Sequence, residues 1–281
     1  MDPFVFGLVL FGAACHAGWN ALIKYGLEPF TTTALIAIAS MLVALPLVPF
    51  VGFPIAEAWP WLIGSIVIHV GYYVGLTEAY RSGDMGQVYP IARGSAPLMT
   101  ATASATLLGE VLGWRAWLGI AVLACGIFLI SLRGGRDIAR IDSRALGFAF
   151  FTAVTICAYS IVDGTGARIS GNAHTYTVWL FVCDGLMMAV FAPLRRGPGV
   201  FINMLRYWKS GLAGGALSFV AYWIAIWAMT VAPIAIVAAL RETSVLFGAA
   251  IAVFLLGEPL RATRVIAALM IVTGLALIRL Q

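Results

Sequence analysis

Residues 107–112 read LLGEVL, and nearly the same segment, LLGEPL, returns at residues 255–260. The two copies begin 148 residues apart, and each has an arginine 17 positions before its glutamate, Arg93 in the first and Arg241 in the second. A repeat that carries both a loop and the helix before it indicates that the chain arose by duplication.

The composition excludes an ordinary soluble protein. Of the 281 residues, 62% are hydrophobic and 10% are charged, whereas a soluble domain carries about 25% charged residues. Ten apolar runs of about 20 residues each have the length that a helix needs to cross a hydrocarbon core of about 30 Å. These runs cover residues 3–23, 31–50, 59–80, 85–107, 114–132, 144–162, 174–193, 208–229, 233–256 and 263–278.

We therefore predict an all-α polytopic membrane protein with ten transmembrane helices. The helices use nearly the whole chain, which leaves no room for a soluble catalytic domain or a nucleic-acid-binding domain, and we expect no nucleic-acid partner. The four cysteines lie in apolar runs without pair spacing, so we expect them to be buried, with no disulfide and no metal. They are Cys15, Cys125, Cys157 and Cys183.

The polar stretch at residues 133–144 divides the chain five helices plus five. We predict a first repeat at residues 1–132, a polar linker at 133–143 and a second repeat at 144–281. Because each repeat has an odd number of spans, the second enters the membrane from the opposite side, which predicts an inverted repeat around a central cavity.

The basic residues of the loops predict an orientation. With Arg93 and Arg241 set aside as intramembrane, 12 basic residues lie on one side and 3 lie on the other, namely Arg115, Arg168 and Arg279. The positive-inside rule then places both termini outside the cytoplasm.

Arg93 and Arg241 each lie about eight residues into a helix, or about 12 Å deep. An arginine at that depth costs at least about 2.5–3.5 kcal/mol, so both should face the interior of the bundle. One interpretation pairs each permanently with an acid such as Glu78 or Glu242. The other makes the two arginines a clamp for an anionic substrate, because a guanidinium offers a planar fork of donors. Pro90 and Pro97 favour the clamp, because they interrupt helical hydrogen bonds beside a cavity.

Several other polar and aromatic residues fall within the spans. Burial favours the neutral form of a carboxyl group, so buried acids are candidate proton carriers or amine ligands, and histidines are candidate relays. Asp163 lies close to a predicted helix end and could be hydrated there, whereas Asp184 has no evident partner. Aromatic residues cluster on the third and eighth helices, where some could line the cavity and others simply pack. Glu110 and Glu258, at the ends of the repeated segments, are interpreted as helix caps.

Three segments carry a family resemblance: HAGWN at residues 16–20 followed by Lys24, GDMGQVYPIAR at residues 83–93, and the two LLGE copies. Together they make the chain resemble a ten-helix member of the drug/metabolite transporter superfamily, of the EamA type. The resemblance implies an inverted five-plus-five fold, a cavity lined mainly by helices one, three, four, six, eight and nine, and export or exchange of small metabolites.

The resemblance bears on substrate and orientation too. In the plastid phosphate-translocator branch, basic residues on helices four and nine hold phosphate, and Arg93 and Arg241 occupy comparable places. Some similar bacterial members are associated with phosphonate utilisation. Typical members keep their termini in the cytoplasm, with basic residues between helices two and three. Residues 51–58 contain none, so the orientation stays open.

The resulting hypothesis is a secondary transporter of the cytoplasmic (inner) membrane that moves a small anionic or zwitterionic metabolite by alternating access. The substrate class is an amino acid, an organic acid, or an organophosphate or phosphonate. The alternatives are an intramembrane enzyme and a substrate-free membrane scaffold. The expected partners are the substrate, the lipid bilayer and, as an open alternative to a monomer, a second copy in a homodimer; no cofactor is expected.

The candidate residues form two groups. The candidate substrate ligands are Arg93, Arg241, Glu78, Glu242, Tyr89, Trp19, Asn20, Tyr73, Tyr222, Trp223 and Trp227. The candidate proton-coupling residues are His16, His69, Asp163 and Asp184.

Overall fold

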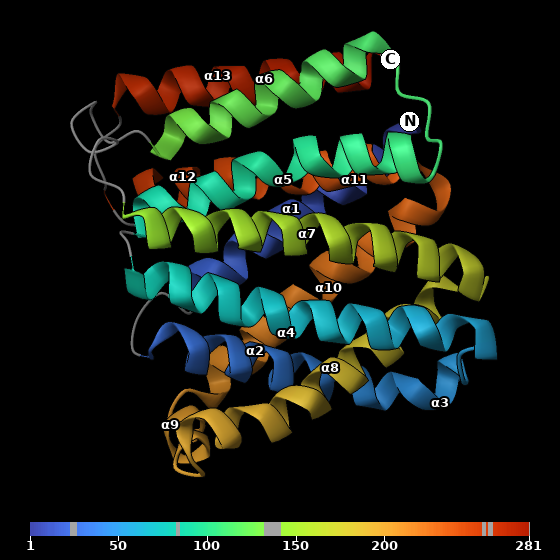
Figure 1. Ribbon diagram of the computed structural model, residues 1–281, viewed down its shortest axis with the longest axis vertical. Coiled ribbons are helices and arrows are strands. Elements are labelled where there is room, and N and C mark those ends of the chain that lie inside the picture. The colour runs from blue at the N-terminus through green and yellow to red at the C-terminus, as the bar shows by residue number, and fades with distance from the viewer. Residues whose placement is uncertain (23–26, 83–84, 132–141, 255–256, 258–260, 281) are drawn as a thin grey trace.

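The structure, a computed structural model, describes residues 1–22, 27–82, 85–131, 142–254, 257 and 261–280. Every regular element in these residues is helical (Figure 1). The first half contains α1 (Pro3–Leu22), α2 (Pro29–Ala44), η1 (Leu45–Leu47), α3 (Val48–Val51), η2 (Ala56–Ala58), α4 (Trp59–Ser82), α5 (Met85–Leu107) and α6 (Trp114–Ser131). The second half contains α7 (Ser143–Ser170), α8 (Ala173–Arg196), α9 (Val200–Leu205), α10 (Trp208–Val231), α11 (Ile234–Arg241), α12 (Ser244–Phe254) and α13 (Ala262–Arg279).

The helices have the length and composition of membrane spans. Eight helical runs in the described residues are long and apolar enough to cross a bilayer, and α6 adds a shorter apolar run, Trp114–Ile130. The helix α5 is 23 residues long but more polar, because it carries Arg93 among glycine, serine and threonine residues. The protein is therefore a multi-pass membrane protein.

Two predicted helices differ from the observed ones. The predicted ninth helix is interrupted at residues 242–243, which separates α11 from α12, whereas α5 continues through both Pro90 and Pro97. The two prolines therefore remove hydrogen-bond donors from the fourth helix without ending it. The predicted sixth helix extends eight residues further, to Ser170, and Gly164 and Gly166 in this extension allow close packing against Ile234 and Tyr176.

Both chain termini lie at the same end of the bundle, which we call the terminal end (Figure 1). Arg279 donates to the carbonyl oxygen of Met1 at 3.1 Å, and Arg115 donates to that of Leu280 at 3.0 Å. The opposite end, where α1, α4 and α8 finish and α2 begins, is the distal end.

The helices α6 and α13 cross closely through glycines. A Cβ atom on Gly119 would lie 2.7 Å from the carbonyl oxygen of Gly274, and one on Gly126 would lie 2.9 Å from that of Ala267. Adding 148 to the residue number relates Gly126 to Gly274 and Gly119 to Ala267. The contact of Gly119 with Gly274 is therefore equivalent to the contact of Gly126 with Ala267. The two helices therefore run antiparallel, with equivalent residues exchanged across their crossing.

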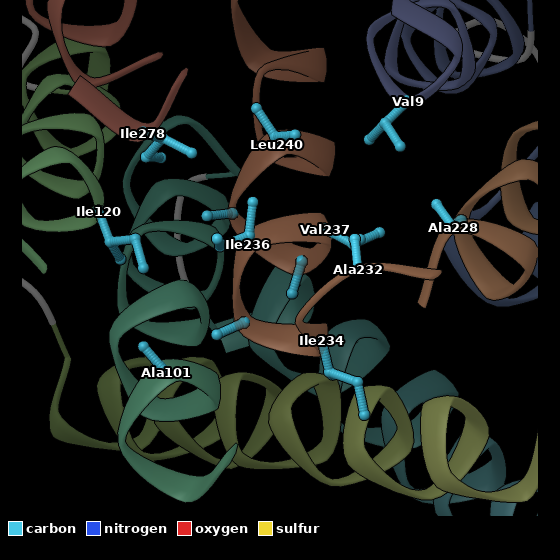
Figure 2. Packing of buried hydrophobic residues seen from close by; sticks show 14 of the residues in the cluster. Val9, Ala101, Ile120, Ala228, Ala232, Ile234, Ile236, Val237, Leu240 and Ile278 are labelled. Atoms are coloured by element: carbon cyan, nitrogen blue, oxygen red, sulfur yellow. The ribbon is translucent and has the colours of Figure 1, made fainter. Parts of the chain in front are cut away.

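The same exchange extends to the other helices. The helix α1 packs against α10 and α12, as α7 packs against α4 and α5. At the centre of one core, residues Ile234 to Leu240 of α11 are all buried against α1, α5, α6, α10 and α13 (Figure 2). Because neighbouring helices cover all of these residues, α11 is shielded from lipid. The core thus fixes α11, and with it Arg241 at its last residue.

Candidate functional site

A cavity lies between helices of the two halves. Its volume is about 110 Å³. At about 10–15 Å³ per water on this measure, it holds roughly seven to eleven waters, which suits a small metabolite. Its walls come from α1, α2, α4, α5, α7, α8, α10 and α11, so α2 and α8 contribute as well as the helices that the resemblance implies. The lining residues are His16, Trp19, Thr33, Ile36, Ala37, Ser40, His69, Tyr72, Tyr73, Leu76, Arg93, Tyr159, Leu180, Phe181, Asp184, Ser218, Tyr222 and Arg241.

The cavity extends toward the distal end. Trp19 lies three residues before the last residue of α1, and Thr33 lies four residues into α2, so the lining reaches about one helical turn from these helix ends. On the terminal side the lining stops near the middle of the bundle, at residues such as Tyr159 in α7 and Arg241 at the end of α11. The cavity is therefore placed in the distal half of the bundle.

Arg93 is held inside the protein by an ion pair. Its Nε lies 2.7 Å from Oε2 of Glu242, and the two side chains are 4% and 5% exposed. The second terminal nitrogen of Arg93 donates to the hydroxyl of Ser244 at 3.2 Å. These contacts join α5 to the break between α11 and α12. The predicted pairing of an intramembrane arginine with Glu242 is confirmed.

Arg241 has a different environment. Its guanidinium lies 4.5 Å from the centre of the Tyr222 ring and lines the cavity. Among the described residues it makes no salt bridge, and its side chain is only partly buried. A guanidinium over an aromatic face keeps its hydrogen-bond donors available at its edge. Arg241 is thus the arginine whose charge is presented to the cavity.

One sequence difference between the halves explains this contrast. The 148-residue offset places Glu242 opposite Gly94, so the first half has no equivalent acid. A Cβ atom at Gly94 would already lie 3.0 Å from the ring of Phe128, which leaves little room for a side chain. The two equivalent arginines therefore have one such glutamate between them, and it forms an ion pair with Arg93.

The break in the ninth span is satisfied by local hydrogen bonds. The amide of Glu242 donates to the carbonyl of Ala239 at 3.2 Å, and that of Thr243 donates to Leu240 at 3.1 Å. The Thr243 hydroxyl also donates to Leu240 at 2.7 Å. Such short-range bonds replace the helical ladder at mid-membrane, where irregular backbone is tolerated when protein encloses it.

Two buried carboxyl groups lie near the cavity, each bonded to tyrosine. Oδ2 of Asp184 accepts from the hydroxyl of Tyr73 at 2.6 Å. Asp163 accepts from Tyr176 at 3.1 Å on one oxygen and from Tyr222 on the other. Asp163 is completely buried, seven residues before the end of α7. The expectation that it is hydrated near a helix end is wrong, because the helix is longer than predicted.

The histidines contact these groups. The ring of His69 stacks on Tyr159 with centres 4.7 Å apart and lies 6.0 Å from the ring of Tyr222. Two nitrogen donors, Trp19 Nε1 and an Arg93 terminal nitrogen, each lie 3.3 Å from a ring nitrogen of His16. A neutral imidazole has one acceptor nitrogen, so no more than one of these contacts is a full hydrogen bond.

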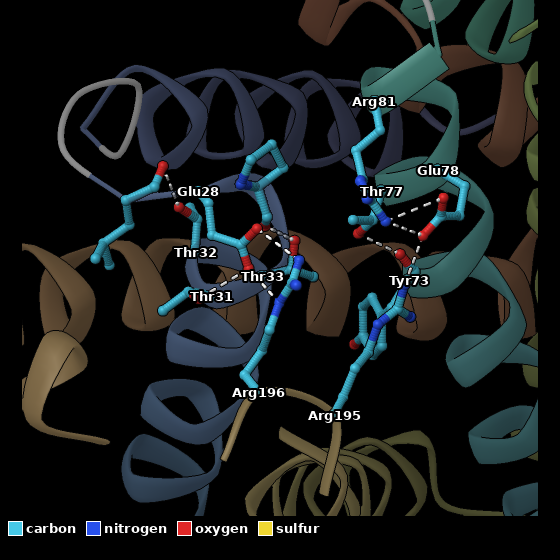
Figure 3. Close-up of polar contacts among 12 residues, drawn as sticks. Glu28, Thr31, Thr32, Thr33, Tyr73, Thr77, Glu78, Arg81, Arg195 and Arg196 are labelled. Carbon is cyan, nitrogen blue, oxygen red and sulfur yellow. Dashed lines mark hydrogen bonds and ion pairs between the residues drawn. The ribbon is translucent and has the colours of Figure 1, made fainter. Parts of the chain in front are cut away.

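Each end of the bundle carries ion pairs. At the distal end Arg195 bonds to Glu78 at 2.7 Å and Arg196 bonds to Glu28 at 2.7 Å (Figure 3). Arg81 bonds to Glu78 at 3.1 Å as well. Glu78 therefore lies far from its predicted place beside Arg93 or Arg241, and that prediction is wrong.

At the terminal end Glu110 joins the two halves. Its carboxylate accepts from the backbone amide of Ile234 at 2.9 Å and from Arg168 at 2.8 Å. Arg168 also donates to the carbonyls of Met229 and Ala232. Glu110 thus caps a helix N-terminus, but the capped helix is α11 rather than the next helix in the chain. Its predicted counterpart, Glu258, lies outside the described residues.

Comparison with known proteins gives the family. The sequence model of the EamA-like transporter family matches residues 4–132 and again residues 143–280. The chain belongs to this family. EamA-like proteins are membrane transporters, and the double match agrees with the duplication indicated by the LLGE segments. No curated protein sequence matches the chain.

A solved crystal structure resembles this EamA-like chain. It has 18% sequence identity, a TM-score of 0.75, and coverage of 99% of this chain and 96% of the other. At that identity the likeness establishes the fold.

Some of the remaining predicted ligands of this EamA-like protein line the cavity and others do not. Trp19, Tyr73 and Tyr222 line the cavity. Trp227 packs in the hydrophobic core, and Trp223 donates to His174 at 2.8 Å. Asn20 is exposed and donates to the carbonyl of His16. Cys125 is exposed, whereas it was expected to be buried. The side chain of Tyr89 lies outside the described residues.

The ion pair inside the EamA-like fold predicts a stability effect. Glu242→Gln should lower the free energy of unfolding by roughly 3–5 kcal/mol, because it leaves the Arg93 charge buried without a partner. The double substitution R93M/E242Q should recover part of the loss, because it removes that charge. Thermal unfolding of the detergent-purified proteins measures both effects. Glu57→Gln, at an exposed acid, is the control, and a Tm for E242Q equal to that of this control would contradict the assignment.

Proposed function

We propose that the protein is a secondary transporter that moves a small anionic or zwitterionic metabolite across the cytoplasmic membrane by alternating access. The observation that supports this proposal most strongly is the environment of Arg241. This cation lies at mid-membrane, lines a cavity and lacks a salt bridge to the described residues. Such a charge is expensive in a bilayer, and binding an anion would offset part of that cost.

Arg241 is the main anion ligand in this proposal. Arg93 contributes to the positive potential of the cavity wall, but Glu242 already neutralises it at 2.7 Å. The cavity holds roughly seven to eleven waters at about 10–15 Å³ each. A carboxylate, phosphate or phosphonate group on a small carbon skeleton fits this combination of one available cation and limited volume.

Alternating access would use the proposed inverted repeat of five plus five spans. The mapped contacts between α6 and α13, and the exchanged neighbours of α1 and α7, support a twofold axis in the membrane plane. Each half would then rock around Arg241 and the cavity. The bonds of Glu110 hold the terminal end closed, whereas the cavity reaches close to the distal end.

The charge pattern supports an orientation for this state. The distal end carries Arg81, Arg195 and Arg196, whereas the terminal end carries Arg115, Arg168 and Arg279. In the full sequence the loops that join helices at the distal end hold the excess of basic residues, which supports a cytoplasmic distal end. The cavity would then be accessible from the cytoplasm.

The assignment of Arg241 predicts a loss of binding and transport. Carboxylates, amino acids, organophosphates and phosphonates are first screened by thermal shift, since a ligand that binds only the folded protein raises its Tm. Uptake of the best ligand into proteoliposomes should fall about tenfold or more in Arg241→Gln, the effect of losing a hydrogen bond to a charged group. Arg206→Gln removes an exposed charge outside the cavity and is the matched control. Wild-type uptake by R241Q protein would overturn the proposed function.

The bonds of Glu110 predict a change in access at the terminal end. Glu110→Gln removes the charge that holds Arg168 and caps α11, so the closed state should become less stable. In a background without native cysteines, Ala232→Cys reports opening, because Ala232 is buried at the start of α11. Its labelling by a water-soluble maleimide should become at least about fivefold faster with E110Q. Glu57→Gln is the control, and an unchanged labelling rate in E110Q would contradict closure by Glu110.

A further inference from the structure

Most acidic residues in the described part of the chain either form a salt bridge with an arginine or cap a helix N-terminus. Asp2 and Asp142 accept backbone amides at helix starts, Glu57 is exposed, and four glutamates bond to arginines. The pairs are Glu28 with Arg196, Glu78 with Arg195, Glu110 with Arg168, and Glu242 with Arg93. Only Asp163 and Asp184, among the acids that the structure describes, are buried without an arginine or lysine partner, and His69 is the basic group that lies close enough to act on both.

Asp163 and Asp184 differ in whether a carboxylate oxygen is left without a hydrogen-bond donor. Both oxygens of Asp163 accept tyrosine hydroxyls, and its side chain is not part of the cavity wall. Asp184 lines the cavity, is 5% exposed, and accepts one hydroxyl, from Tyr73, on Oδ2. Its Oδ1 has no hydrogen-bond partner among the described residues. A buried carboxylate oxygen without a donor is costly, so its presence beside a cavity calls for a ligand.

Close packing holds Asp184 in place. The next residue, Gly185, brings α8 so near α2 that a Cβ there would lie 2.9 Å from the carbonyl oxygen of Ala37. Ala37 itself lines the cavity. The carboxylate is therefore carried by a rigid helix contact and oriented by the Tyr73 hydroxyl, which suits a binding residue.

We propose that Asp184 binds the ammonium group of the substrate, so that the transported metabolite is a zwitterion with an amine at one end and an anionic group at the other. This inference rests on the proposed function, in which Arg241 binds the anionic end. An unpaired cation and an unpaired anion then line one cavity, and a zwitterion would neutralise both. A simple anion would leave Oδ1 of Asp184 without a hydrogen-bond donor.

The surrounding rings favour a cation at this place. The rings of Tyr72 and Tyr73 lie 5.6 Å apart, and Tyr72 lies 5.8 Å from Tyr159. All three belong to the cavity wall with Asp184. The negative faces of aromatic rings attract an ammonium group, and a primary amine can also donate to Oδ1 of Asp184.

The test compares ligands that differ only in their amine. The probes are β-alanine against propionate, and 2-aminoethylphosphonate against ethylphosphonate, measured by thermal shift on the full-length protein in detergent. The wild-type protein should bind the aminated member of at least one pair about tenfold more tightly, the effect of a hydrogen bond to a charged group. The two pairs separate a carboxylate requirement from a phosphonate requirement.

Two substitutions separate charge from structure. Asp184→Asn removes the charge but keeps an acceptor for Tyr73, whereas Tyr73→Phe removes the hydrogen bond but keeps the charge. The preference for the aminated member should disappear in D184N and persist in Y73F. Retention of the amine preference in folded D184N protein would overturn the assignment, as would equal loss in both variants, which indicates a structural role.

The outcomes distinguish the inference from the function on which it rests. If both members of a pair bind equally to the wild-type protein and R241Q loses both, the anion site stands and the amine site is wrong. If D184N abolishes coupling to a proton gradient but keeps the amine preference, Asp184 is a proton carrier and the inference is wrong. If no probe shifts the Tm and no uptake is found, both proposals fail.

Discussion

The buried ion pair between Arg93 and Glu242 is the contact on which the rest of the site depends. It joins α5 of the first half to the break between α11 and α12 in the second half. Breaking such a pair leaves an uncompensated charge inside the membrane, so the two elements are held together. Because Glu242 is engaged with Arg93, the equivalent Arg241 keeps its charge available, and the cavity gains a cation that no acid in the described part of the chain neutralises.

In this duplicated chain, a difference at one pair of equivalent positions makes the site asymmetric. Gly94 in the first half corresponds to Glu242 in the second, and Phe128 fills the space beside Gly94. Asp184 and Tyr73, which come from α8 and α4, line the same cavity as Arg241. In the proposed mechanism the symmetry would supply two halves that can move, and the departures from symmetry would supply a site with two different ends.

Much of the fold was predictable because apolar length is a strong signal in a membrane protein. The observed bounds of α5 match the predicted run at residues 85–107, and the LLGE copies located both arginines. The break after Arg241 was not predictable from hydropathy, since it depends on which backbone carbonyls the amides of Glu242 and Thr243 reach. The position of Asp163 was misjudged because α7 continues beyond its apolar run, to Ser170, where hydropathy gives no signal. The bond from Tyr73 to Asp184 joins residues 111 positions apart and required the packed structure.

The central claim is that Arg241 presents a guanidinium without a salt bridge to the cavity, whereas Glu242 neutralises Arg93 in the same cavity wall. Arginine modification with phenylglyoxal, followed by mass spectrometry of the peptides, measures this directly on the wild-type protein. The account predicts that Arg241 is modified rapidly, that a bound anionic ligand protects it, and that Arg93 stays unmodified beside Glu242. Rapid modification of Arg93 with Arg241 unreactive would contradict it.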